Sequence, residues 1–148
     1  MRLRPWVILS ALLCVTAPVQ AQQPVPAGRI KVVTGSAFVV RGAQELPARV
    51  GLVVAASDTL RTGADGTLGV TLRDDTRVSL GPGSEVRVER FLYDPGAGQL
   101  GLALRFVRGI TAYVSGRIAR LSPDAIRLET PAAIVGVRGT TLLIRVTE

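Results

Sequence analysis

Histidine is absent from this sequence of 148 residues, and cysteine occurs once, at Cys14. Without histidine, the chain lacks the side chain that most often serves as a general base near neutral pH, and it lacks a common zinc ligand. It also lacks the usual partner of a serine or cysteine nucleophile. We therefore predict a non-enzymatic protein with no catalytic residue, no metal site and no cofactor. A hydrolase that uses carboxylates alone is the remaining catalytic alternative, and it would need two acids facing each other across a cleft.

Aromatic residues are also scarce, at 4% of the chain, and Lys31 is the only lysine. Few aromatic rings mean few platforms on which nucleic-acid bases could stack. The net charge of +7 comes almost entirely from arginine, and no lysine-rich cluster marks a focused basic patch. We therefore expect no nucleic-acid partner.

The longest apolar run lies near the N-terminus, from Trp6 to Ala17, after two arginines. It is shorter than the roughly 20 residues that a membrane-spanning helix needs. This order of basic, apolar and small residues is typical of a secretory signal peptide. We predict a signal peptide over residues 1–21, cleaved after Ala21, and an exported, periplasmic mature protein without a transmembrane helix. A retained membrane anchor and lipid attachment at Cys14 are alternatives, and the leucine before that cysteine argues against the second.

Cleavage at that point would remove Cys14, so the mature protein would contain no disulfide and would depend on its apolar core. The rest of the sequence is dominated by short runs in which apolar and polar residues alternate, the pattern of half-buried strands. Strands are expected over residues 29–34, 36–40, 67–72, 77–80, 85–89, 100–107, 110–114 and 126–129. Turn-forming residues separate these runs, and residues 41–45 form a predicted loop. Residues 50–56 fit either a buried strand or a helical turn.

No sustained helical period follows the N-terminal segment, and turn signals recur about every 8–12 residues, as in all-β domains. We predict an all-β domain over residues 29–147, built as a β-solenoid-like or sandwich-like stack of short strands. A short segment rich in glutamine and proline precedes it, and we predict a disordered linker over residues 22–28.

Arginines alternate with carboxylates on several predicted strands, as in the run Glu85, Arg87 and Glu89. One interpretation is a solvated face with cross-strand charge pairs. The other is attraction to acidic polymers or anionic lipid headgroups. Arg77, Arg87 and Arg127 are the candidate residues of such a binding face.

Two motifs occur in sequence. The first contains Thr62, Gly63, Asp74 and Ser84, and the second contains Thr130, Pro131, Val137, Arg138, Gly139 and Thr140. Together, and in this order, they resemble the motifs of the FecR domain family. The resemblance spans nearly the whole predicted mature chain and implies an all-β periplasmic domain in which these residues are structural. The chain departs from the family pattern at Asp75-Thr76, where Gly-Ser is usual. Aspartate tolerates the left-handed backbone of such a turn better than most residues do.

Two shorter patterns have structural interpretations. Asp74 and Asp75 are adjacent acids in a predicted tight turn, which favours turn formation over catalysis. The run from Gly96 to Gly101 matches G-x-G-x-x-G, but a dinucleotide site needs a helix to open on that loop. Here an alternating strand pattern follows, so we predict a hairpin loop.

FecR-type regulators of iron uptake also carry a cytoplasmic anti-sigma segment, a membrane helix and a further periplasmic domain. This sequence shows none of these patterns, so we do not expect it to relay a signal across a membrane alone. The leading hypothesis is a non-catalytic periplasmic module that binds another envelope protein through its strand edges or an arginine-rich face. One alternative is a module that holds peptidoglycan or another acidic glycan. Another is an accessory role in the sigma-factor regulation of iron uptake.

Overall fold

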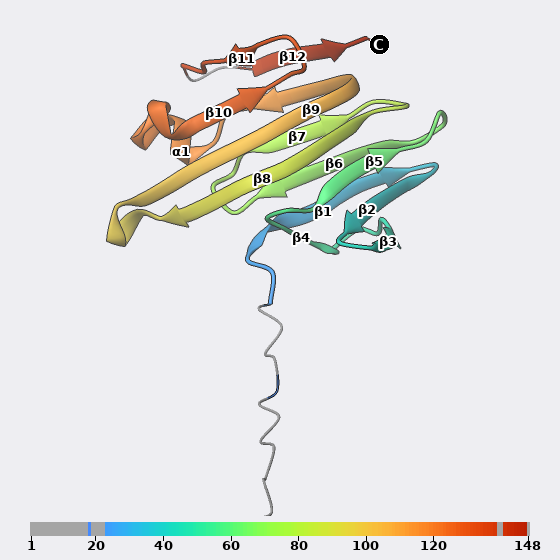
Figure 1. The fold of residues 1–148 in the computed structure, drawn as a ribbon, viewed down its shortest axis with the longest axis horizontal. Coiled ribbons are helices and arrows are strands. Elements are labelled where there is room, and N and C mark those ends of the chain that lie inside the picture. The colour runs from blue at the N-terminus through green and yellow to red at the C-terminus, as the bar shows by residue number, and fades with distance from the viewer. Residues whose placement is uncertain (1–17, 19–22, 139–140, 148) are drawn as a thin grey trace, which may run out of the picture.

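The computed structural model describes Pro18, residues 23–138 and residues 141–147 (Figure 1). The first elements in chain order are β1 (Pro26–Thr34), β2 (Ala37–Arg41), β3 (Gln44–Pro47), β4 (Val53–Ala55), β5 (Thr59–Thr62), β6 (Thr67–Leu72), β7 (Arg77–Leu80) and β8 (Glu85–Asp94). They are followed by η1 (Pro95–Ala97), β9 (Gln99–Val114), α1 (Arg117–Leu121), η2 (Pro123–Ala125), β10 (Ile126–Glu129), β11 (Ile134–Val135) and β12 (Thr141–Val146). The predicted all-β class is confirmed. Apart from Pro18, the predicted signal peptide lies outside the described residues.

The strands form one curled sheet with the shape of a half-barrel, and β9 joins its two halves (Figure 1). Half A contains β4, β1, β6, β7, the second part of β9 and β12. Half B contains β3, β2, β5, β8, the first part of β9, β10 and β11. All of these pairs are antiparallel except β9 with β10. The parallel pair is possible because α1 and η2 bring the chain back along the sheet before β10 begins.

Alternation along the strands places one side of each half in a common core. In β6 and β7 every second side chain is buried, as the sequence pattern predicts. The inner surfaces of both halves contribute to one hydrophobic cluster, whose largest fully buried members include Ile30, Leu60, Leu68, Leu102, Leu104, Phe106, Tyr113, Ile118 and Leu128. Burying one such aliphatic side chain contributes about 1.5–3 kcal/mol, so this cluster is the main source of stability.

Strand boundaries differ from the predictions at the start of the domain. β1 begins at Pro26, so the last three residues of the predicted disordered linker, 26–28, are part of the sheet. Ala27 is fully buried, and the segment pairs with both β4 and β6. This core contact orders residues whose composition alone indicates a linker.

Three further features were wrong or left open in the sequence-based assignment. The predicted loop over residues 41–45 is a hairpin, in which a two-residue turn at Gly42-Ala43 joins β2 to β3. For residues 50–56 the extended alternative is the observed one, since they include β4. The predicted break at Gly109 is a bend within the continuous strand β9, at the point where it passes from half B to half A.

Tyr113 lies on the inner surface of half A, between Val78 of β7 and Leu142 of β12, and is fully buried. Burial is the main cause that raises the pKa of Tyr113 above its usual value. The neutral phenol is therefore favoured in the folded protein, whereas an unfolded tyrosine ionises near pH 10, at about its ordinary pKa. We expect stability to fall as the pH rises above about 10, by up to about 1.4 kcal/mol per pH unit from this group.

A Tyr113→Phe variant should lose less stability between pH 8 and about pH 11 than the wild-type protein does. Urea unfolding at both pH values measures the difference. Tyr93→Phe is the control, because Tyr93 is only half-buried. An equal alkaline loss in the Tyr113→Phe variant would contradict this assignment.

Candidate functional site

The first family motif forms a buried corner that ties β5, the 81–84 turn and the bend of β9 together. The Thr62 hydroxyl donates to the Gly81 carbonyl (2.7 Å) and accepts from the Ser84 amide (2.9 Å). The Ser84 hydroxyl in turn contacts both the amide and the carbonyl of Ile110, each at 3.0 Å. The Gly63 amide donates to the Ser36 carbonyl. Thr62 and Ser84 are buried, so their groups hold the fold and are not available to a ligand.

Asp74 fixes the turn between β6 and β7 and the start of α1. Its carboxylate is fully buried and accepts from the Thr76 amide (3.1 Å), the Thr76 hydroxyl (2.7 Å) and the Ile118 amide (3.4 Å). Asp75 adopts a left-handed backbone with φ of 67° and is exposed. The two adjacent acids therefore point into different environments and do not face a common substrate.

The second family motif is placed only in part. The Thr130 hydroxyl contacts the amide (3.1 Å) and the carbonyl (3.2 Å) of Ala133, which closes the turn around exposed Pro131. Val137 is buried in the core, and Arg138 is exposed. Gly139 and Thr140 lie outside the described residues.

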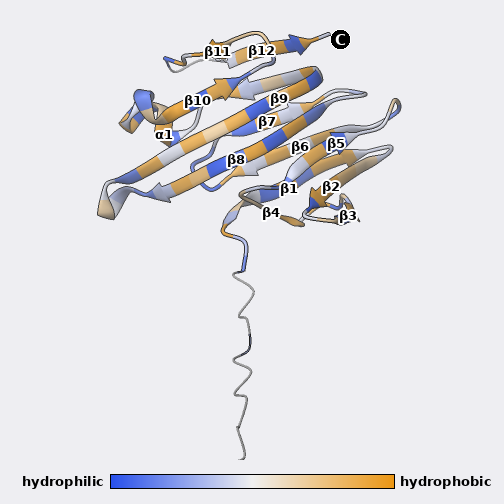
Figure 2. Ribbon diagram, viewed as in Figure 1, coloured by the Kyte–Doolittle hydropathy of each residue, from blue (hydrophilic) through white to orange (hydrophobic). Residues whose placement is uncertain are grey.

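Ion pairs balance much of the charge on the outer surface of half B, called face B, and leave Arg87 and Arg90 of β8 outside the network. The pairs are Arg61 with Glu45 and Glu85, Arg108 with Glu85, Arg105 with Glu89 and Glu129, and Arg127 with Glu129. Every glutamate of the described residues takes part in this network. Hydrogen bonds from Arg127 and then Arg105 lower the pKa of Glu129. Figure 2 shows hydrophilic residues, in blue, along the neighbouring strands β8 and β9. Arg87 lies among them, opposite Thr59 and Arg105.

The outer surface of half A, called face A, has a different composition. Its exposed or half-buried strand residues are mainly small or uncharged, namely Thr34, Thr67, Gly69, Thr71, Ser79, Ala112, Val114 and Thr141. Two apolar side chains are largely exposed on this face, Val32 at 54% and Leu143 at 71%. The charged strand residues of the face are Arg29, Lys31, Arg77 and Arg145, all of them basic. Face A therefore carries positive charge that no carboxylate on its own strands balances.

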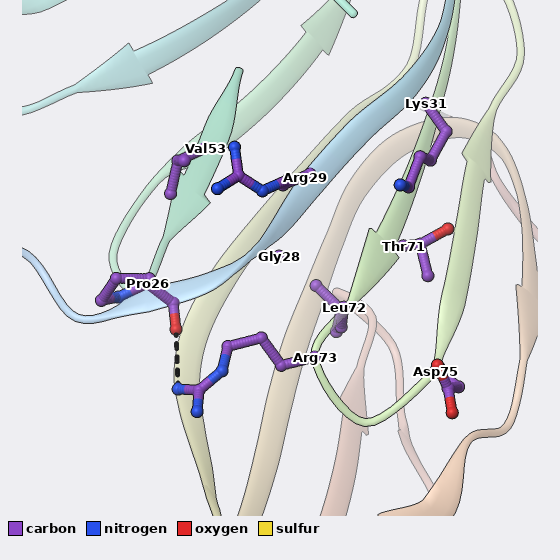
Figure 3. A pocket seen from close by; sticks show the side chains of 9 residues that line it. All are labelled: Pro26, Gly28, Arg29, Lys31, Val53, Thr71, Leu72, Arg73 and Asp75. Atoms are coloured by element: carbon purple, nitrogen blue, oxygen red, sulfur yellow. Dashed lines mark hydrogen bonds between the residues drawn. The ribbon is translucent and has the colours of Figure 1, made fainter. Parts of the chain in front are cut away.

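Two adjacent hollows lie at one end of face A. The first has a volume of about 580 Å³ and is lined in part by Arg29, Lys31 and Arg73 (Figure 3). The second has a volume of about 430 Å³ and is lined in part by Arg77, Arg117 and Arg120. Thr71 and Asp75 line both, so the hollows adjoin each other. We call the six basic residues the basic rim.

Most of the basic rim is not engaged in ion pairs. Arg117 pairs with Asp75 at 2.9 Å, and both side chains are more than half exposed. Arg29 donates to the Gly51 carbonyl at 3.1 Å, and Arg73 donates to the Pro26 carbonyl at 3.5 Å. Within the part of the chain that the structure describes, Lys31, Arg77 and Arg120 make no side-chain hydrogen bond or ion pair.

The structure separates the three arginines of the predicted binding face. Arg87 and Arg127 lie on face B, and Arg127 is already paired with Glu129. Arg77 lies on face A, in the basic rim. The other five members of the rim were missed, although Arg29 and Lys31 alternate at the start of a predicted strand. They were missed because no signal in the sequence shows that β1, β6 and β7 are neighbours in the sheet.

Other kinds of site have no support in the described ranges. No group of three or more His, Cys, Asp or Glu residues there is arranged to hold a metal ion. No helix among the same residues has the length and apolar character needed to cross a bilayer.

The fold and the surface together define an all-β domain whose two outer faces differ in charge, with shallow basic hollows at the end of one face. The family model for the FecR protein matches residues 58–148, which is more than half of the chain, and the chain belongs to this family. No curated protein and no solved structure matches it. The FecR family is a non-enzymatic, signalling-related regulatory family, and membership suggests protein interactions in signalling.

Proposed function

We propose that this protein is an exported, non-catalytic module of the cell envelope that serves signalling by docking a partner protein on face A. The observation that carries the proposal is the difference between the two faces. On face B every glutamate of the described residues is paired with an arginine and Arg87 and Arg90 remain unpaired, whereas the strands of face A present basic residues with no acid among them. The family relation to signalling proteins is consistent with such a role.

Energetic reasons also favour face A as the docking surface. A partner on face B would have to replace ion pairs that arginine and glutamate side chains already make there. The net gain in binding free energy would therefore be small. A partner on face A meets cations with free donors and can cover Val32 and Leu143, whose burial is favourable. The central residues of face A are small, so the backbone or side chains of a partner can approach its strands closely.

The basic rim also favours a second candidate function, retention of an acidic envelope polymer such as peptidoglycan or another acidic glycan. Lys31, Arg77 and Arg120 have no partner among the described residues and could each meet an anionic group. Such binding would rest mainly on charge and would be lost as salt is added.

Site-specific photo-crosslinking in intact cells tests the leading proposal. A photoreactive amino acid at Ser79 on face A should give an adduct with one defined protein, and the same amino acid at Arg87 on face B should not. The adduct should disappear in a Val32→Glu/Leu143→Glu double variant, because two buried carboxylates would replace the apolar contacts. Equal amounts of the variant and unmodified protein must reach the envelope.

Equal adducts from Ser79 and Arg87 would contradict docking on face A. Adducts with glycan alone that are lost in moderate salt would support the polymer-binding candidate in place of the protein-binding one.

A further inference from the structure

Three residues form a straight row across the basic end of face A. Arg29 of β1 lies opposite Thr71 of β6, and Thr71 lies opposite Arg77 of β7. Neighbouring strands are about 4.8 Å apart, so the backbones at Arg29 and Arg77 are about 10 Å apart, with the threonine between them. The two arginines belong to the two adjoining hollows, which both border Thr71. The row therefore fixes the backbones of two basic residues on either side of Thr71, while the Arg29 guanidinium itself reaches toward β4, where it donates to the Gly51 carbonyl (Figure 3).

This spacing suits a chain with repeated carboxylates better than a single small anion. Arginine binds carboxylates through two parallel hydrogen bonds, and the fork of its guanidinium fixes their direction. Along an extended peptide, side chains on one side recur about every 6.6–6.8 Å. Long arginine and lysine side chains can adjust by the remaining few ångströms, so carboxylates on alternate residues could enter the two hollows together.

Further members of the basic rim flank the row, Lys31 farther along β1 and Arg73 just after β6. Figure 3 shows Lys31 on the same side of β1 as Thr71 and Asp75, while the Arg73 guanidinium lies beside the Pro26 carbonyl. Arg117 and Arg120 border the second hollow. Asp75 is the single acid of the two hollows and is held by Arg117. The hollows thus keep a net positive charge across β1, β6 and β7.

We propose that the docked partner presents an extended, carboxylate-rich peptide segment, which lies across β1, β6 and β7 and places its carboxylates in the two hollows. The inference rests on the proposed function, because it names the part of the partner that face A receives. A peptide fits better than a polysaccharide for two reasons. The hollows have no aromatic ring among their described lining residues on which a sugar could stack, and Val32 and Leu143 offer apolar contacts to peptide side chains.

Binding of a labelled peptide of alternating Glu and Thr tests the inference. The protein is purified from the cell fraction in which it accumulates, and fluorescence anisotropy gives the Kd at low and moderate salt. The Glu peptide should bind, more weakly as salt rises, and a matched peptide of alternating Gln and Thr should not. An Arg29→Gln/Arg77→Gln double variant should bind the Glu peptide about tenfold more weakly or worse.

The matched control is an Arg87→Gln/Arg127→Gln double variant, which removes the same charge from face B. It should bind the peptide within about twofold of the unmodified protein, since long-range effects of exposed charges are screened by salt. Thermal unfolding of both variants confirms that each is folded. Equal losses in the two double variants would overturn the inference, because binding would then follow net charge alone.

Two further outcomes separate this inference from the proposed function. If the Glu peptide does not bind while the Ser79 crosslink to one protein persists, face A docks a partner of other chemistry and the acidic-segment inference fails alone. If soluble polygalacturonate displaces the peptide at lower carboxylate concentration than the unlabelled Glu peptide does, the basic rim prefers an acidic polysaccharide and the inference is overturned.

Discussion

Replacing Asp74 with alanine is expected to lower the free energy of unfolding by about 3–5 kcal/mol, because it leaves several buried donors without a partner. The fully buried carboxylate accepts from the amide and hydroxyl of Thr76 and from the Ile118 amide. Water cannot replace it without opening the turn between β6 and β7 and loosening α1. Urea unfolding followed by circular dichroism measures the loss.

The control removes the next carboxylate along the chain. Asp75 has a φ of 67°, which glycine adopts without strain, and its ion pair with Arg117 is exposed. Asp75→Gly should therefore change stability by less than about 1 kcal/mol, in either direction. If Asp74→Ala costs no more than this control, the buried hydrogen bonds of Asp74 do not hold the turn.

The Gly109→Ala substitution is expected to cost about 3–5 kcal/mol, through left-handed backbone strain and overpacking together. Gly109 has a φ of 85° at the bend of β9. A Cβ added there would lie 2.3 Å from the Ser84 hydroxyl oxygen and 2.5 Å from its Cα atom. Ser84 cannot move aside, because its hydroxyl is bonded to both backbone groups of Ile110.

Gly98→Ala separates the two causes of that loss. Gly98 has a φ of 67°, but a Cβ added there would meet no atom within 4 Å. This variant should show the backbone strain alone, about 1–2 kcal/mol. Chemical unfolding of both variants gives the comparison. Similar losses at the two glycines would show that the close approach of Ser84 to β9 contributes nothing.

Local patterns in the sequence predicted those strands whose environment is regular. The alternating runs over residues 67–72 and 77–80 coincide with β6 and β7, because each strand has one buried and one solvated side. β3 was missed because its pattern of exposure is weak at a sheet edge. The start of β1 was missed because Ala27 is buried by strands far along the chain, which no local pattern reports.

The candidate site was harder to predict than the strands. Arg77, Arg87 and Arg127 all follow the same alternating pattern, yet the curl of the sheet places them on two different faces. Only the pairing of β1 with β6 and of β6 with β7 places Arg29 and Arg77 on either side of Thr71. That order depends on long-range packing, so single-residue patterns could identify exposed arginines but could not say which of them converge.

The continuity of β9 has a consequence for how binding at one face affects the whole domain. Its 16 residues pair with β8 and β10 in half B and with β7 and β12 in half A. Because the two halves share β9, we expect the opening of either half to disrupt hydrogen bonds of the other, so that both exchange hydrogen as one cooperative unit. A ligand that binds only the folded form on face A raises the free energy of opening for that unit. The amides of β8 and β10 then exchange more slowly, although the ligand lies on the other face.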